Sequence, residues 1–239
     1  MPDFVLLTGM MCDERLFTSL VPELSPPSTI HTPDLTGHDD WNNLADDVLS
    51  TMPDQAILLG VSFGGALALE ICARAPDRVG GLVFVDANPH ADTAERRAGR
   101  LQVLDDLQRI GLYRLMWEKF FPNYLAQSTP TLRSRDAILQ LCWDMAEACG
   151  TRVFDRQTKA LLSRRSRLDE LGDFKAPTLI LRGAEDHICP ADYHLALGAK
   201  LSQAVYREIP GSGHLPVLEN PEYVTKELKT WMTQNGIVP

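Results

Sequence analysis

The chain has 239 residues, of which 44% are hydrophobic and 23% are charged, and its formal net charge is −9. This length suits one α/β domain with a sizeable core, or two small domains, and the composition is typical of a soluble globular protein. The acidic balance argues against a nucleic-acid partner. No apolar run approaches the roughly 20 residues of a membrane-spanning helix, so we expect no membrane partner.

The cysteines suggest a reducing compartment. There are five, an odd number, and no two of them form a CxxC pair. The first ten residues have no basic region ahead of their apolar run, which makes them a poor signal peptide. We therefore expect a cytoplasmic protein. The sequence contains no recognisable zinc spacing, phosphate loop or dinucleotide fingerprint, so we expect neither a metal nor a cofactor.

The first part of the chain alternates short apolar runs with helix-forming runs. Strands that are apolar on both sides and joined by helices are typical of a parallel sheet covered on both faces. The expected strands are residues 4–8, 28–32, 56–61 and 81–87, and the expected helices are residues 42–50 and 63–75.

The pattern changes over residues 89–172, where helical spacing replaces the strand signals, and it then resumes. The later expected elements are a strand ending at residue 183, a helix near 191–200, a strand at 204–210 and a helix near 221–235. We therefore predict an α/β core formed by residues 1–88 and 173–239, interrupted by a helical insertion over residues 89–172.

The insertion also differs in charge. Residues 91–172 hold 14 Lys and Arg against 11 Asp and Glu, a balance of +3, whereas the rest of the chain has a balance of −12. A solvated helical surface explains this difference. We favour this explanation, and the alternative is a basic lid that attracts an acidic substrate.

Polar side chains gather where the expected strands end. Ser62 follows the third strand, Asp86 the fourth, Asp186 the fifth and His214 the sixth. Because the carboxyl ends of parallel strands share one edge of the sheet, these residues are expected to lie close together, where ligands of open sheets bind.

The motif GVSFG at residues 60–64 stands between a strand and a helix, which is the setting of a nucleophile elbow. A side chain at Gly60 or Gly64 is expected to collide with the neighbouring strand or helix. Ser62 would sit at a helix N-terminus, where a developing anion is favoured. A serine hydroxyl needs a base to take its proton, and otherwise Ser62 is a turn serine that caps the helix.

His214 is the expected base, and Asp186 would orient it and stabilise the imidazolium. Asp86 remains the alternative acid, and His187 the alternative base. The expected donors to the oxyanion are the backbone N–H groups of Met10 and Phe63.

These pieces together resemble the α/β-hydrolase superfamily over nearly the whole length. The resemblance is to a small carboxylesterase and lactonase branch that includes pimeloyl-ACP methyl ester esterases, enol-lactonases and carbon–carbon bond hydrolases. The segments that carry the resemblance are LLTGMM, PDLTGH, GVSFGGALALEICARAPDRVGGLVFVDA, LILRGAEDHICP and IPGSGHLPVLENP.

The resemblance implies a mostly parallel six-stranded sheet with a helical cap inserted after the fourth strand. The antiparallel hairpin that usually precedes the first strand has no sequence to form it, and Thr8-Gly9 stands where the family commonly has His-Gly. The first strands would then lie near an exposed edge of the sheet, which leaves a homo-oligomer open.

The implied activity is that of a serine hydrolase acting on a small carboxylic ester or lactone through an acyl-enzyme. The alternatives are a carbon–carbon bond hydrolase or lyase using the same triad, a cofactor-free perhydrolase and a ligand sensor with slow turnover. The substrate is a small molecule, and an acidic one if a cap arginine binds a carboxylate.

No substrate-binding residue can be assigned from the sequence, but several types are suited to the pocket. The cap arginines considered are Arg109, Arg114, Arg133 and Arg152, and the apolar cap residues considered are Met116, Trp117, Phe120, Phe121, Tyr124 and Trp143. The other pocket candidates are His38 and His90, while Cys12 and Cys189 are interpreted as small buried hydrophobes near the loops.

Overall fold

The computed structural model describes residues 3–24, 29–128 and 134–237. It contains one sheet of six strands in the order β2-β1-β3-β4-β5-β6, in which every neighbouring pair is parallel. The predicted fold class is thereby confirmed. The strands are β1 (Asp3–Leu7), β2 (Ile30–His31), β3 (Ala56–Val61), β4 (Val79–Val85), β5 (Thr178–Gly183) and β6 (Ala204–Ile209).

The strand expected at residues 28–32 is only the two-residue edge strand β2, and residue 28 lies outside the described residues. The central strands β3 and β5 are buried at every position, as expected for parallel strands covered on both faces. Burial of an apolar side chain as complete as that of Phe84 contributes roughly 1.5–3 kcal/mol.

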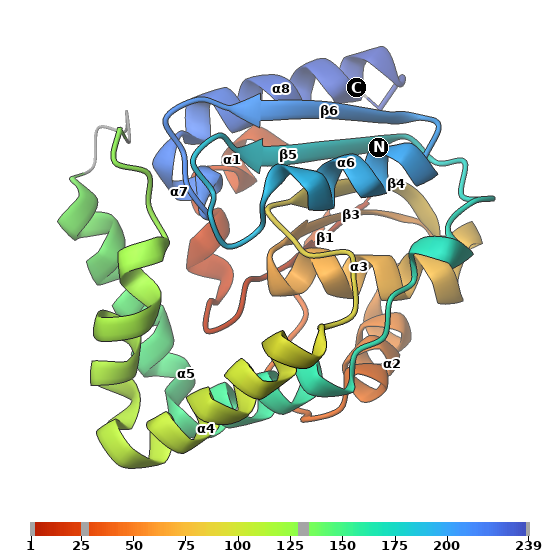
Figure 1. Cartoon of the computed structure of the whole chain (residues 1–239). Coiled ribbons are helices and arrows are strands. Elements are labelled where there is room, and N and C mark those ends of the chain that lie inside the picture. Colours follow the sequence, from red (N-terminus) through yellow and green to blue (C-terminus); the bar gives the residue numbers. More distant parts are fainter. Residues whose placement is uncertain (1–2, 25–28, 129–133, 238–239) are drawn as a thin grey trace.

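Helices cover the two faces of the sheet (Figure 1). Because successive side chains of a strand point to opposite faces, every strand except the short β2 contributes side chains to two separate apolar clusters. One cluster joins the sheet to η1 (Glu14–Phe17), α1 (Val21–Leu24) and α8 (Pro221–Gln234). The other cluster joins it to α2 (Trp41–Thr51), α3 (Phe63–Arg74) and α6 (Ala191–Lys200). Short helices η2 (Pro76–Arg78) and α7 (Pro216–Glu219) complete the core.

The chain between β4 and β5 forms a helical layer on the side toward which the strand arrows point (Figure 1). Its two long helices pack against each other, and each is broken at a glycine with positive φ, at Gly111 and Gly150. The elements of this layer are α4 (Ala94–Leu115), η3 (Met116–Phe120), η4 (Phe121–Asn123), α5 (Arg135–Ser163) and η5 (Leu168–Glu170).

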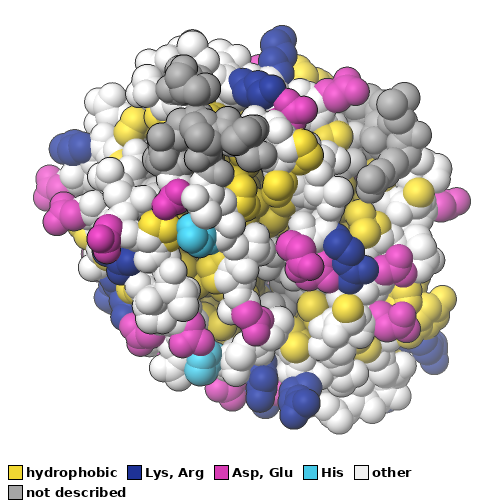
Figure 2. Space-filling view, turned by 180° about the vertical axis from the view of Figure 1, so that it is seen from behind, with side chains coloured by type: hydrophobic (Ala, Val, Ile, Leu, Met, Phe, Trp, Pro, Cys, Tyr) yellow, Lys and Arg dark blue, Asp and Glu magenta, His cyan; other side chains and the backbone are white. Residues whose placement is uncertain are grey.

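Two surface properties accompany this fold. Within the described residues, no helix combines the length and the apolar character needed to cross a membrane. Figure 2 shows acidic and basic side chains scattered over the rear face, without a continuous basic field among the residues that it colours.

Candidate active site

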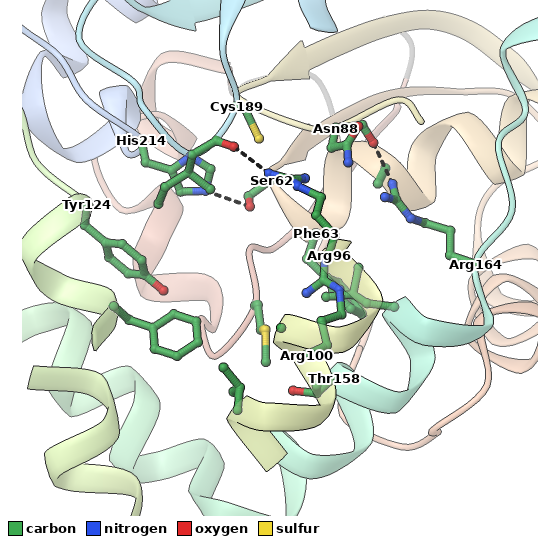
Figure 3. Close-up of a pocket in the computed structure, with 17 residues that line it drawn as sticks. Ser62, Phe63, Asn88, Arg96, Arg100, Tyr124, Thr158, Arg164, Cys189 and His214 are labelled. Carbon is green, nitrogen blue, oxygen red and sulfur yellow. Dashed lines mark hydrogen bonds between the residues drawn. The ribbon is translucent and has the colours of Figure 1, made fainter. Parts of the chain in front are cut away.

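Ser62 lies in the turn between β3 and α3, with φ 52° and ψ −109°. Such backbone angles are uncommon for a residue other than glycine and are typical of strained functional turns. The turn lifts the side chain into a cavity, where Ser62 Oγ lies 2.8 Å from His214 Nε2 (Figure 3). The serine therefore has a histidine within proton-transfer distance.

The glycines around Ser62 are required by close backbone contacts. A Cβ on Gly64 would lie 2.1 Å from the carbonyl oxygen of Leu7 in β1, and one on Gly60 would lie 2.5 Å from the carbonyl oxygen of Gly64. Both distances are far below van der Waals contact. The crossing of the turn over β1 thus leaves no room for a side chain, as the motif predicted.

Asp186 holds the other ring nitrogen of His214. Its Oδ2 lies 2.9 Å from His214 Nδ1, and its Oδ1 accepts the N–H groups of Ile188 at 2.8 Å and Cys189 at 3.2 Å. Burial acts to raise the pKa of Asp186, but His214 and the donated hydrogen bonds outweigh it and lower this pKa to about 2. An ionised Asp186 assigns the proton to Nδ1 and leaves Nε2 free to accept the Ser62 proton.

Asp86 does not lie where the acid that orients His214 would have to lie. It is fully buried with φ 42°, and its carboxyl accepts the N–H of Gly183 at 3.0 Å and contacts the carboxyl of Asp186, not His214. Burial, and then the Asp186 charge, raise the pKa of Asp86 well above its usual range. Asp86 is therefore the carboxyl of this pair that keeps its proton to higher pH, because two adjacent buried carboxyls do not both ionise readily.

This protonation predicts a pH-dependent stability. The unfolded chain releases the Asp86 proton near pH 4, whereas the folded chain keeps it. The contribution of Asp86 to the free energy of unfolding therefore falls as pH rises above about 4, and Asp186 adds little slope there because it is largely ionised in both states. Asp86→Asn is neutral and nearly isosteric, so it should stabilise the protein more at pH 8 than at pH 4.5. Urea denaturation at both pH values measures this difference, and a variant equally or less stabilised at pH 8 would contradict it.

Met10 and Phe63 both line the cavity beside Ser62, as expected for oxyanion donors. Neither backbone N–H has a hydrogen-bond partner among the described residues. The next residue in the loop, Met11, has φ 58° and donates its N–H to Gln157 Oε1 at 2.9 Å. Gln157, buried in α5, also donates to the carbonyl of Leu35 at 3.1 Å, so it braces this loop from the helical layer.

Glu219 fixes the loop that carries His214. Its Oε1 accepts the N–H groups on both sides of His214, from Gly213 at 2.9 Å and Leu215 at 3.1 Å, and its Oε2 accepts the N–H of Ala126 at 2.7 Å. The N–H of His214 itself donates to the carbonyl of Tyr124 at 2.7 Å. The sequence reasoning missed both Gln157 and Glu219, because nothing in their local sequence sets them apart from surface polar residues.

The cavity has a volume of about 390 Å³, suited to a small molecule. Of the six apolar cap residues considered from the sequence, Phe120 and Tyr124 line it, and the other four do not. The complete lining is Met10, Ser62, Phe63, Ala66, Asn88, Arg96, Gly99, Arg100, Val103, Phe120, Tyr124, Thr158, Leu161, Arg164, Ile188, Cys189 and His214.

The cap arginines considered from the sequence are not in this lining. Arg109 and Arg114 are exposed and pair with Asp106 and Glu118, and Arg152 is exposed. The fourth, Arg133, lies outside the described residues. Three other arginines line the cavity instead, namely Arg96 and Arg100 of α4 and Arg164 at the end of α5.

None of the other histidines considered reaches the cavity. His187 is exposed, His38 pairs with Asp47 at 2.8 Å, and the ring of His90 packs against Tyr193. The structure therefore gives no support to His187 as the base, because His214 alone contacts both Ser62 and Asp186.

Cys12 and Cys189 are both buried, as expected, and Cys189 also lines the cavity. Burial raises the pKa of the Cys189 thiol well above its usual range, so it stays protonated. Among the described residues, Asp186, Cys189 and His214 bring three potential metal ligands within 4.8 Å. Since the Asp186–His214 hydrogen bond occupies two of them and the third is protonated, this grouping does not indicate a metal site.

Comparison with known proteins places this chain among esterases in sequence. A pimeloyl-[acyl-carrier protein] methyl ester esterase from Photobacterium profundum is 28% identical over 246 residues, covering 96% of this chain and 94% of that protein. One from Aromatoleum aromaticum is 26% identical, covering 92% and 94%. The sequence resemblance to this branch is thus confirmed.

Solved structures share the fold. A thermophilic esterase from Thermogutta terrifontis, with malate bound, superposes with a TM-score of 0.85 at 23% identity, covering 98% of this chain and 90% of that one. The enol-lactonase from Burkholderia xenovorans has the same TM-score at 19% identity, covering 97% and 91%. The sequence profile of the Alpha/beta hydrolase family matches residues 4–227, which is nearly the whole chain. This protein is therefore a member of the alpha/beta hydrolase family.

Proposed function

We propose that this protein is a serine hydrolase that cleaves a small carboxylic ester or lactone through an acyl-enzyme intermediate. The observation that carries the proposal is the continuous hydrogen-bonded chain from Ser62 through His214 to Asp186, with Ser62 and His214 in the wall of the cavity. The activity in the names of the curated relatives supports the same reaction class.

In the proposed mechanism, Ser62 Oγ attacks the carbonyl carbon while its proton passes to His214 Nε2. The N–H groups of Met10 and Phe63 stabilise the oxyanion, and Asp186 stabilises the imidazolium. His214 then gives the proton to the departing alkoxide, which leaves an acyl group on Ser62. A water activated by His214 hydrolyses this acyl group, so that one ester and one water give one acid and one alcohol.

A second candidate is a carbon–carbon bond hydrolase or lyase that uses the same three residues. One observation favours it: three arginines of the helical layer converge on the cavity that holds Ser62. Such an enzyme would carry a reactive Ser62 but hydrolyse short esters negligibly.

Labelling with a fluorophosphonate tests the proposal. We expect one adduct, formed when Ser62 Oγ displaces fluoride, mapped to Ser62 by peptide mass spectrometry, together with turnover of short acyl p-nitrophenyl esters. An adduct without ester turnover would favour the second candidate. If the experiment gave no adduct and no turnover, the assignment of Ser62 as the nucleophile would be overturned.

A further inference from the structure

One side of the cavity is built from cations. Arg96 and Arg100 lie one turn apart on α4, and Arg164 stands at the end of α5. In Figure 3 these arginines lie on the side of Ser62 away from Tyr124. Together they form a wall, called here the arginine wall, that faces the same space as the candidate nucleophile.

Only one carboxylate among the described residues pairs with the arginine wall. Asp92 is buried and binds Arg100 through two hydrogen bonds, one of them 3.2 Å long, and it lies 3.7 Å from Arg164 Nη2. Three guanidinium groups and one carboxylate leave a net charge of +2 on this side of the cavity. A net charge of this size beside a largely apolar cavity favours an anionic ligand.

Arg96 is the arginine of the wall whose positive charge is not paired with a carboxylate among the described residues. Among the described residues it forms no ion pair, and its guanidinium is held by the carbonyl of Ile188 at 3.0 Å and by the ring of Tyr193, 5.3 Å away. These contacts orient the group without neutralising it. A guanidinium has five N–H donors, so donors remain for a ligand.

Arg164 gives an independent indication of a ligand. Its side chain is only 3% exposed, and its Nε is a buried donor that has no acceptor among the described residues. Burial is the main cause that lowers the pKa of Arg164 to about 10, and the charges of Arg100 and Arg96 lower it further. It is still a cation at neutral pH, and the Asp92 carboxylate that pairs with it is shared with Arg100, so a further anion beside Arg164 is favoured.

We infer that the arginine wall binds a carboxylate of the substrate, so that the ester or lactone cleaved here is an acidic one. The inference rests on the proposed function for its reaction, but the anion site does not depend on Ser62 chemistry. A carboxylate matches the planar fork of a guanidinium and accepts two N–H groups at once. The volume of the cavity restricts the ligand to a small molecule that carries both the carboxylate and the reacting carbonyl.

A matched pair of esters tests the inference. Methyl hydrogen adipate and methyl hexanoate differ only in a terminal carboxylate against a methyl group. Methanol release should show kcat/KM at least about 10-fold higher for the charged ester, and this preference should weaken as salt screens the wall. The measured quantity is the ratio of the two kcat/KM values.

Arg96→Gln should lower this ratio about 10- to 100-fold, mainly through KM of the charged ester, as loss of a hydrogen bond to a charged group does. Arg96→Lys keeps the charge and should retain part of the ratio. The matched control is Arg114→Gln, which removes the same charge from an exposed site on α4 and should leave the ratio unchanged. A purely structural role of Arg96 would slow both esters equally and leave the ratio intact.

The outcomes separate this inference from the proposed function. Cleavage of both esters with a ratio near or below one would overturn the acidic substrate and leave the hydrolase intact. If neither ester is cleaved, titration calorimetry of adipate binding to the Ser62→Ala protein tests the anion site without catalysis. Binding that weakens with Arg96→Gln added would support the arginine wall as a carboxylate site, and absence of binding would overturn it.

Discussion

Replacing Ser62 by alanine is expected to reduce kcat/KM for a short acyl p-nitrophenyl ester by about 10⁴-fold or more. The reason is that the hydroxyl is the nucleophile of the proposed acyl-enzyme mechanism, and its oxygen lies 2.8 Å from the nitrogen that would take its proton. The variant should stay folded, because the backbone hydrogen bonds of Ser62, to the carbonyl of Val85 and from the N–H of Ala66, do not involve the side chain. Initial rates and a thermal melt measure the two effects.

The control for this variant is Ser212→Ala, which removes a second buried serine from the same rim of the sheet. Among the described residues, Ser212 Oγ donates one long hydrogen bond, to the carbonyl of Pro210 at 3.5 Å, so its loss should cost less than about tenfold in rate. If Ser62→Ala kept most of the wild-type turnover while folded, Ser62 would be a turn serine and the proposed mechanism would be wrong.

Asp186→Asn is expected to lower kcat by about 10⁴-fold, whereas Asp86→Asn should lower it less than about tenfold. An amide at position 186 cannot stabilise the imidazolium, and it favours the tautomer of His214 with its proton on Nε2, the wrong nitrogen. An amide at position 86 reproduces the protonated acid, since it accepts from the N–H of Gly183 and donates to Asp186. Steady-state kinetics of both variants with one ester measures the contrast.

The variants at positions 86 and 186 are matched controls for each other, because both carboxyls are buried and each contacts the other. Any nonspecific damage from placing an amide in this part of the sheet should affect both variants. The opposite order, with Asp86→Asn the slower enzyme, would move the acid to the end of β4. If both variants kept the wild-type rate, neither carboxyl would orient His214.

The order of strands and helices was predictable because it depends on local patterns. Short apolar runs such as AILLGV and LVFV, separated by helix-forming runs, favour buried strands, and the helices between them supply the covering faces. The GVSFG turn was equally predictable, because the contact of Gly64 with Leu7 excludes every side chain and therefore leaves a trace in the sequence. What failed was the length of β2, a two-residue edge strand with little burial to specify its ends.

The cavity wall was not predictable, and the arginines show why. The sequence reasoning considered Arg109, Arg114, Arg133 and Arg152, while the structure places Arg96, Arg100 and Arg164 around the cavity. All belong to the same helical insertion and have the same side chain. Which of them faces inward depends on the breaks at Gly111 and Gly150 and on how the helices dock, and neither is encoded in local periodicity.

The sequence by itself determined the family, the parallel sheet and the expected order of serine, acid and histidine, because each is recognised from short motifs whose own residues are close together in the chain. Tertiary structure alone decided which carboxyl meets His214, which buried acid stays protonated, and how Gln157 and Glu219 hold the loops of the site. It also decided that the cavity is cationic on one side. These properties depend on distances between side chains far apart in sequence, and electrostatic energy in a buried site is set by those distances.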